Sequence, residues 1–171
     1  RGYTFTMTYR LLLGAGCLLL LLTACGNYDF SVNDRVVYRP GPLFEDYQIP
    51  DLALRNCIDR AISSNSISAA AQLSTLDCSN SGVSSLAGLS TFTGIQQLSL
   101  SYNAIVDLSE LGSLSVLQTL YIDHNQVVEA VPLYQLPALV SVDLRANPAL
   151  ICPDSVSLFR AQTVLLPKHC R

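Results

Sequence analysis

Apolar residues recur at intervals of 22 positions in the second half of the chain. Four segments begin at Leu73, Ile95, Leu117 and Leu139, and each carries further apolar residues at its fourth and sixth positions. Apolar and polar residues alternate around the third to seventh positions, which predicts a short strand with one buried face. Because the four segments are equally spaced, we expect their strands to pair side by side in a parallel sheet.

The four segments share the pattern L-x-x-L-x-L-x-x-N. The last three copies end at Asn103, Asn125 and Asn147, whereas the first has Ser81 in that place. A repeat of roughly 20–29 residues with this signature resembles the leucine-rich repeat family. The resemblance implies an α/β solenoid, a short horseshoe with a parallel sheet on its concave face. It also implies that the asparagine amides satisfy backbone groups in the turn after each strand.

The remainder of each repeat predicts the convex side. In the second repeat, aliphatic residues follow at steps of three, at Ile105, Leu108, Leu111 and Leu114. This spacing favours a tight 3₁₀ return over a long helix. The third repeat has Pro132 in this part, so we expect a looser return there. A motif core at 161–166 predicts a fifth strand. We assign 73–150 to the repeats and 151–171 to a C-terminal cap that contains this strand.

Residues 44–72 predict an N-terminal helical cap. Pro50 and Asp51 provide a helix start, and Leu54, Ile58 and Ile62 fall on one helical face together with Ala61. A solenoid needs such a cap because its terminal repeat otherwise exposes apolar core. The run from this helix into the first strand resembles that of internalin-like bacterial repeat proteins.

The front of the chain predicts export. Met7 is the only methionine, so residues 1–6 are expected to precede the true start. An apolar run then covers residues 11–24. Its length as a helix is roughly 21 Å, short of the roughly 30 Å hydrocarbon core of a membrane. We interpret residues 1–24 as a secretory signal peptide and not as a membrane span.

The signal ends in Leu-Thr-Ala-Cys at Cys25, and Gly26 follows. This resembles the lipobox of bacterial lipoproteins, which implies lipidation of Cys25, with palmitate as a label of the acyl chains. Two or three acyl chains hold a protein durably at a membrane, whereas one does so only marginally. Residues 25–43 are polar and irregular and are expected to tether the domain. Gly26 is not the aspartate of inner-membrane retention, so the family's rule favours the outer membrane.

The charge of the remaining chain excludes one class of partner. Arg1 and Arg10 are removed with the expected signal peptide, so the remaining chain has eight basic and thirteen acidic side chains. A nucleic-acid-binding protein would show a basic face, and no run of basic residues is present. We therefore expect no nucleic-acid partner, and the sequence holds no cofactor motif.

Four cysteines follow the lipobox, Cys57, Cys78, Cys152 and Cys170. An even number in an exported protein indicates disulfides, with three possible connectivities. Pairing Cys57 with Cys78 and Cys152 with Cys170 would secure each end of the solenoid, and this is the pairing that we predict. A zinc site is disfavoured because no C-x-x-C pair occurs.

The expected binding surface is the concave face, where the third, fifth, seventh and eighth motif positions present their side chains. The candidate ligand-binding residues there are Gln97, Ser99, Ser101, Tyr102, Tyr121, Asp123, His124, Asp143 and Arg145. Aromatic residues and arginine concentrate binding energy in interfaces. Five strands about 4.8 Å apart give a face of only about 360 Å², less than the roughly 800 Å² that a standard interface takes from each partner.

These observations favour a lipid-anchored module of the bacterial envelope that binds a protein or peptide. Two alternatives stay open. One is a binder of glycan or peptidoglycan, or a passive structural lipoprotein. The other is an enzyme that uses Asp123, His124 and Asp143. The sequence has no nucleophile elbow, phosphate-binding glycine loop or H-E-x-x-H motif, so we expect a protein without enzymatic activity and without a metal site.

Overall fold

The structure is a computed structural model that describes residues 30–32, 35–38, 44 and 46–170. The expected start at Met7, the signal peptide and the lipobox cysteine Cys25 lie outside these residues. Within the part of the chain that the structure describes, no helix is long and apolar enough to cross a membrane. The chain divides into two compact units, residues 1–41 and 42–171.

The first unit contains a short antiparallel pair of strands. Strand β1 (Phe30–Val32) pairs with β2 (Arg35–Tyr38), with a shift of register after Phe30. The sequence analysis expected an irregular tether over residues 25–43, and this pairing corrects that expectation in part. The two strands are rich in aromatic and β-branched residue types, which favour extended pairing.

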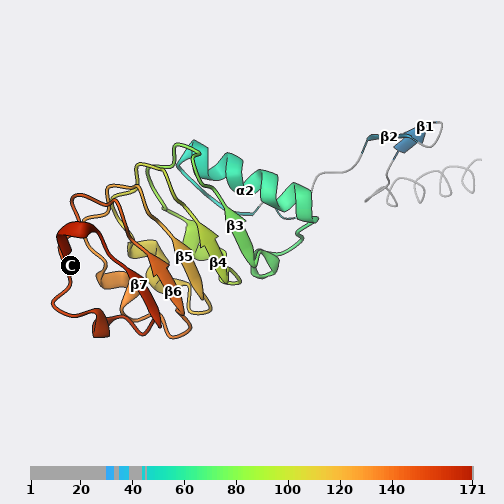
Figure 1. Cartoon of the computed structure of the whole chain (residues 1–171). Coiled ribbons are helices and arrows are strands. Elements are labelled where there is room, and N and C mark those ends of the chain that lie inside the picture. The colour runs from blue at the N-terminus through green and yellow to red at the C-terminus, as the bar shows by residue number, and fades with distance from the viewer. Residues whose placement is uncertain (1–29, 33–34, 39–43, 45, 171) are drawn as a thin grey trace, which may run out of the picture. The chain divides into compact units, whose positions relative to one another are not determined.

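The second unit is a solenoid built on one parallel sheet. Its strands are β3 (Thr75–Asp77), β4 (Gln97–Ser99), β5 (Thr119–Tyr121), β6 (Ser141–Asp143) and β7 (Thr163–Leu165). They follow one another in sequence order across the sheet (Figure 1). Each pairs in register with the residue 22 positions away, for example Leu76 with Leu98. The 22-residue period thus sets the register, and the expected fifth strand is confirmed.

The apolar motif positions form one continuous core. The first, fourth and sixth positions are all buried, as in Ile95, Leu98 and Leu100. The convex returns also contribute to the core, with Leu108, Leu111 and other residues from their 3₁₀ helices and adjoining turns. Each strand therefore buries one face and leaves the alternate side chains to the concave face.

The convex returns are 3₁₀ helices, as expected. They are η2 (Leu89–Thr91), η3 (Ser109–Ser113) and η4 (Val131–Leu133), with η5 (Val156–Leu158) and η6 (Lys168–Cys170) near the C-terminus. The third repeat, where a looser return was expected, also has a 3₁₀ helix, of three residues against the five of η3. Pro132 lies in the first turn of η4, where a missing N–H costs no internal hydrogen bond, so the proline is compatible with the helix.

The predicted cap helix is α2 (Leu52–Asn65), which is followed by the 3₁₀ helix η1 (Ala70–Gln72). Leu54, Cys57, Ile58 and Ile62 form its buried stripe, beside β3 (Figure 1). The helix thus covers the first repeat, as the amphipathic pattern predicts.

Asp51 fixes the start of this helix and ties it to the first repeat. One carboxylate oxygen accepts the Leu54 N–H at 2.9 Å, an N-cap bond. The other accepts the N–H groups of Ser84 and Ser85 and the Ser84 hydroxyl. Partial burial acts to raise the pKa of Asp51, but these hydrogen bonds outweigh it, and the pKa lies below its usual value.

The motif asparagines form a hydrogen-bonded ladder. Asn125 is buried; its Nδ2 donates to the carbonyls of Leu100 and Ile122, and its Oδ1 accepts the Ile105 N–H. Asn103 and Asn147 make the equivalent bonds one repeat away. Each amide therefore connects two neighbouring turns, the role that the family resemblance implies.

Both predicted disulfides are present, Cys57–Cys78 and Cys152–Cys170. The first is buried and joins α2 to the residue after β3. The second joins the segment after the fourth repeat to η6. Each bridge closes a local loop at one end of the solenoid, where the terminal repeat has a neighbouring repeat on one side only.

Candidate functional site

The concave face carries a compact group of aromatic, charged and hydroxyl side chains, of which the tyrosines, His124 and Arg145 are exposed. We define the concave patch as Ser101, Tyr102, Tyr121, Asp123, His124, Asp143 and Arg145. Tyr102 is 57% exposed and Tyr121 is 46% exposed, although both are large side chains. The structure also places Gln97 and Ser99 on strand β4, where Ser99 lies beside Tyr121 in the ladder.

Two rings in the patch stack face to face. The rings of Tyr102 and His124 have centroids 4.1 Å apart and planes 11° apart. The two residues hold the same motif position in neighbouring repeats, and both have left-handed backbone, with φ of 59° and 54°. This conformation is uncommon for bulky residues. It turns both side chains in the same direction at the end of their strands, which brings the rings together.

Asp123 organises one half of the patch. Its carboxylate accepts a hydrogen bond from the Ser101 hydroxyl in the preceding repeat and lies 2.7 Å from Nδ1 of His124. Partial burial acts to raise the pKa of Asp123. The hydrogen bonds from Ser101 and His124 oppose this effect, and the net result is a lowered pKa. The carboxylate therefore stays ionised and holds the imidazole in place beneath the tyrosine ring.

Arg145 is held by Asp143 in the other half. Nε lies 2.9 Å from Oδ1 and Nη2 lies 2.6 Å from Oδ2, a bidentate pair. The hydrogen bond to Asp143 raises the pKa of Arg145 above its usual value. The sequence analysis placed Asp143 among the exposed ligand-binding residues, but its side chain is 6% exposed. Asp143 thus positions the guanidinium, and Arg145 is the group that faces solvent.

The contacts around His124 do not form a nucleophile–base pair. Ser101 donates to Asp123 and not to His124, and Asp143 is engaged with Arg145. In a serine triad, the imidazole must contact the hydroxyl that it deprotonates. The hypothesis of an enzyme that uses Asp123, His124 and Asp143 therefore gains no support from this geometry. The arrangement is instead suited to presenting a rigid surface.

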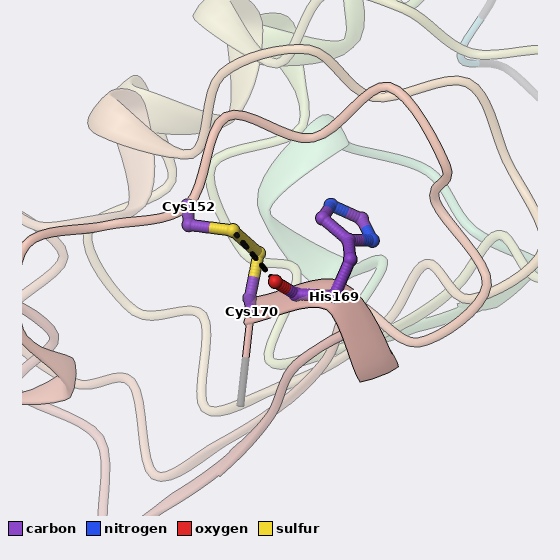
Figure 2. Close-up of side chains that lie close together, drawn as sticks. All are labelled: Cys152, His169 and Cys170. Atoms are coloured by element: carbon purple, nitrogen blue, oxygen red, sulfur yellow. Dashed lines mark hydrogen bonds between the residues drawn. A yellow bond between two sulfur atoms is a disulfide. The ribbon is translucent and has the colours of Figure 1, made fainter.

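A second cluster lies at the C-terminal end, where Cys152, His169 and Cys170 converge (Figure 2). Their potential ligand atoms lie within 4.8 Å of one another. Both sulfurs are joined in the disulfide, so neither is a thiolate, the form that binds metals. Nε2 of His169 lies 3.0 Å from the Leu150 carbonyl. The cluster therefore secures the C-terminal cap in this oxidised state.

A third feature was missed by the sequence analysis. A concavity of about 1380 Å³ lies between α2 and β3, and we call it the α2–β3 groove. Asn56, Arg60 and Ser64 line it from the helix and follow at steps of four. That polar stripe beside the buried one was the signal in the sequence, because residues four apart share a helical face.

Comparison with known proteins agrees with this architecture. The model of the LRR domain of the endo-beta-N-acetylglucosaminidase EndoS matches residues 49–149. No curated protein sequence matches the chain.

Two solved structures of Listeria monocytogenes internalins are similar. Internalin C2 superposes with a TM-score of 0.59 at 21% identity, over 73% of this chain and 57% of internalin C2. Internalin F gives a TM-score of 0.47 at 19% identity, over 78% of this chain and 48% of internalin F. The first of these similarities shows a shared fold, and the chain spans little more than half the length of that relative.

Proposed function

Because the chain belongs to the leucine-rich repeat family represented by the LRR domain of EndoS, we propose that it is a protein-binding module of the bacterial cell envelope. The module binds its partner through the concave patch and is held at the membrane by a lipid on Cys25. It acts by binding and without enzymatic activity, cofactor or nucleic acid.

The observation that supports binding most strongly is the exposure of large side chains in a rigid setting. Tyr102 and Tyr121 remain about half exposed, yet Tyr102 is stacked on His124. Arg145 is fixed by two hydrogen bonds to Asp143. Ordering these groups before a partner arrives lowers the entropy that binding must overcome. Tyrosine and arginine are also the residue types that carry most energy in interfaces.

The size of the patch favours a partner with a small contact. Five short strands provide about 360 Å², which is below the roughly 800 Å² per partner of a standard interface. A peptide or a single element of a protein suits such an area. A complete globular domain would require further surface from elsewhere.

Alanine substitutions test the patch. We expect the combined variant Tyr102→Ala, Tyr121→Ala and Arg145→Ala to lose at least about tenfold in capture of its envelope partner, since such anchors each contribute more than about 1 kcal/mol. The measurement is quantitative pull-down from detergent-solubilised envelopes, with the circular dichroism spectrum unchanged. A control variant replaces Val106, Val131 and Arg160, three exposed residues outside the strands.

Undiminished capture by the triple variant would refute the role of the patch. Equal losses in the control variant would do the same. Binding of both variants to protein-free sacculi would favour the glycan alternative.

The lipid anchor has an independent test. We expect labelled palmitate to be incorporated into the wild-type protein and to be absent from Cys25→Ser, because the sulfur is the site of the diacylglyceryl group in lipoproteins. The variant should move from the membrane to the soluble fraction, since the loss of two or three acyl chains removes most of the membrane affinity. Cys17→Ser serves as the control, and loss of label in that variant instead would refute the assignment of Cys25.

A further inference from the structure

We propose that the α2–β3 groove is a second binding site, and that it takes an extended polar peptide of about six residues that carries a basic side chain. This site adds to the proposed function and does not depend on the concave patch. The groove is lined by residues of α2, of β3 and of the segments around them, and β3 is the first strand in the order of the sheet (Figure 1).

The groove has the length of a short peptide. Its helical wall extends from Ala53 to Asn65, which is about 20 Å at 1.5 Å per residue. An extended chain advances about 3.3 Å per residue, so about six residues span the wall. The volume of about 1380 Å³ exceeds the roughly 300–1,000 Å³ of pockets for small ligands.

The opposite wall is an edge of the sheet. Among the residues that the structure describes, strand β3 pairs with β4 alone, and residues such as Ser74 and Cys78 make hydrogen bonds to the residues of β4 and its ends. Backbone groups of a strand alternate in direction, so Thr75 and Asp77 turn theirs toward the groove. The Asp77 carbonyl lies 3.2 Å from Sγ of Cys57, so the disulfide closes that end of the edge. Thr75 leaves an N–H and a carbonyl directed at an incoming chain.

The side chains around this edge match a peptide backbone. Amides and hydroxyls dominate the lining, contributed by Asn56, Asn65, Gln72, Asn80, Ser64 and Ser81 among others. An amide side chain offers a donor and an acceptor together, as each peptide group does. Gln72 uses Oε1 to accept from Ser68, and Asn65 uses Nδ2 to donate to the Ala61 carbonyl, so these two amides offer a peptide their other group. The lining contains no aromatic residue. A sugar ring would therefore have no ring to pack against, and for this reason we favour a peptide over a glycan.

The charges in the groove specify a basic peptide. Two carboxylates, Asp59 and Asp77, and one guanidinium, Arg60, line it. Asp77 accepts the Ser79 N–H through Oδ1, Asp59 accepts a hydrogen bond from the Tyr47 hydroxyl through Oδ1, and Arg60 donates through Nε to the Asn56 carbonyl. The lining thus carries one net negative charge, and a lysine or arginine in the peptide would neutralise it.

A random heptapeptide library displayed on phage provides the probe. It is selected on the full chain in mild detergent, and the enriched peptides are then synthesised and titrated by fluorescence anisotropy. We expect enrichment of peptides with lysine or arginine. Ser64→Trp, which fills the groove, should weaken their binding at least about tenfold. Ser63→Trp is the matched control, because Ser63 is exposed on the same helix outside the groove, and it should change the affinity less than about twofold.

A charge reversal tests the electrostatic part. Arg60→Glu should strengthen binding of the basic peptides about threefold, whereas Arg55→Glu, outside the groove, should have less effect. Circular dichroism and the unfolding midpoint of each variant establish that the fold is retained.

Several outcomes would overturn this inference. Failure of the library to enrich any peptide is one, and equal binding to Ser64→Trp is another. If the selected peptides bind Ser64→Trp but no longer bind the concave-patch triple variant, their binding site is the concave patch. The groove site would then be refuted, and the proposed function would stand. Binding of a tetramer of N-acetylglucosamine that Ser64→Trp abolishes, without peptide binding, would assign the groove to a glycan.

Discussion

Replacing Asn125 with alanine is expected to lower the free energy of unfolding by about 4 kcal/mol. The side chain is 4% exposed. Its amide bonds the carbonyls of Leu100 and Ile122 and the N–H of Ile105. Alanine leaves these groups without their partner, and each buried unsatisfied group costs about 1–3 kcal/mol. Urea unfolding followed by circular dichroism measures the loss.

Its neighbours provide matched controls. Asn103 makes equivalent bonds but is half-buried, so water can reach the freed groups and Asn103→Ala should cost less. Gln126→Ala changes an exposed side chain and should stay within about 0.5 kcal/mol of the wild type. A loss below about 1 kcal/mol for Asn125→Ala would show that the ladder does not stabilise the solenoid.

Replacing Phe92 with alanine is expected to cost a similar amount, about 4 kcal/mol, as for other fully buried phenylalanines. Phe92 is 0% exposed. Its ring meets those of Tyr47 and Phe44 edge to face, at centroid distances of 5.2 and 6.0 Å. These contacts hold the segment before α2 against the convex return of the first repeat. The midpoint of thermal unfolding should fall by about 12 °C, at roughly 3 °C per kcal/mol.

The local effect of Phe92→Ala has its own readout. The segment from Phe44 to Ile49 should be cut faster by chymotrypsin in this variant, because its aromatic contacts are lost. The close approach of this segment also requires Gly88, where a Cβ would lie 2.2 Å from the Gln48 carbonyl oxygen. Phe92→Leu keeps most of the buried volume and should cost less than about 1.5 kcal/mol. Equal cleavage rates in Phe92→Ala and wild type would refute this account of the segment.

The sequence was sufficient to predict the repeats because buried and exposed side chains recur in them with one period of 22 residues. A residue such as Leu98 is buried by its place in the 22-residue repeat, and the same place recurs in Leu120 with the neighbouring strand. The cap helix was predictable for a similar reason, from Asp51 at its start and one aliphatic stripe. The disulfides followed because each pair closes a local loop at one end of the solenoid.

The details of the candidate site depend on features that periodicity does not contain. The left-handed backbone recurs with the repeat, at Asn80, Tyr102, His124 and Ala146. The motif specifies apolar positions and an asparagine but no backbone angle, so the stacking of Tyr102 on His124 could not be predicted from it. Asp143 is buried beneath Arg145, whose guanidinium donates hydrogen bonds to its carboxylate. The repeat pattern does not contain this side-chain contact. The α2–β3 groove depends on the distance between α2 and β3. The sequence predicts each of these elements but not the distance between them.

Site-specific crosslinking in living cells tests the central claim most directly. A photoreactive phenylalanine analogue is placed at Tyr121, and at Val131 as the control, since that residue is 54% exposed but lies in the convex return. Binding through the concave patch predicts a discrete protein adduct from Tyr121 and none from Val131. An adduct from Val131 alone, or no protein adduct from either position, would contradict a protein-binding concave face.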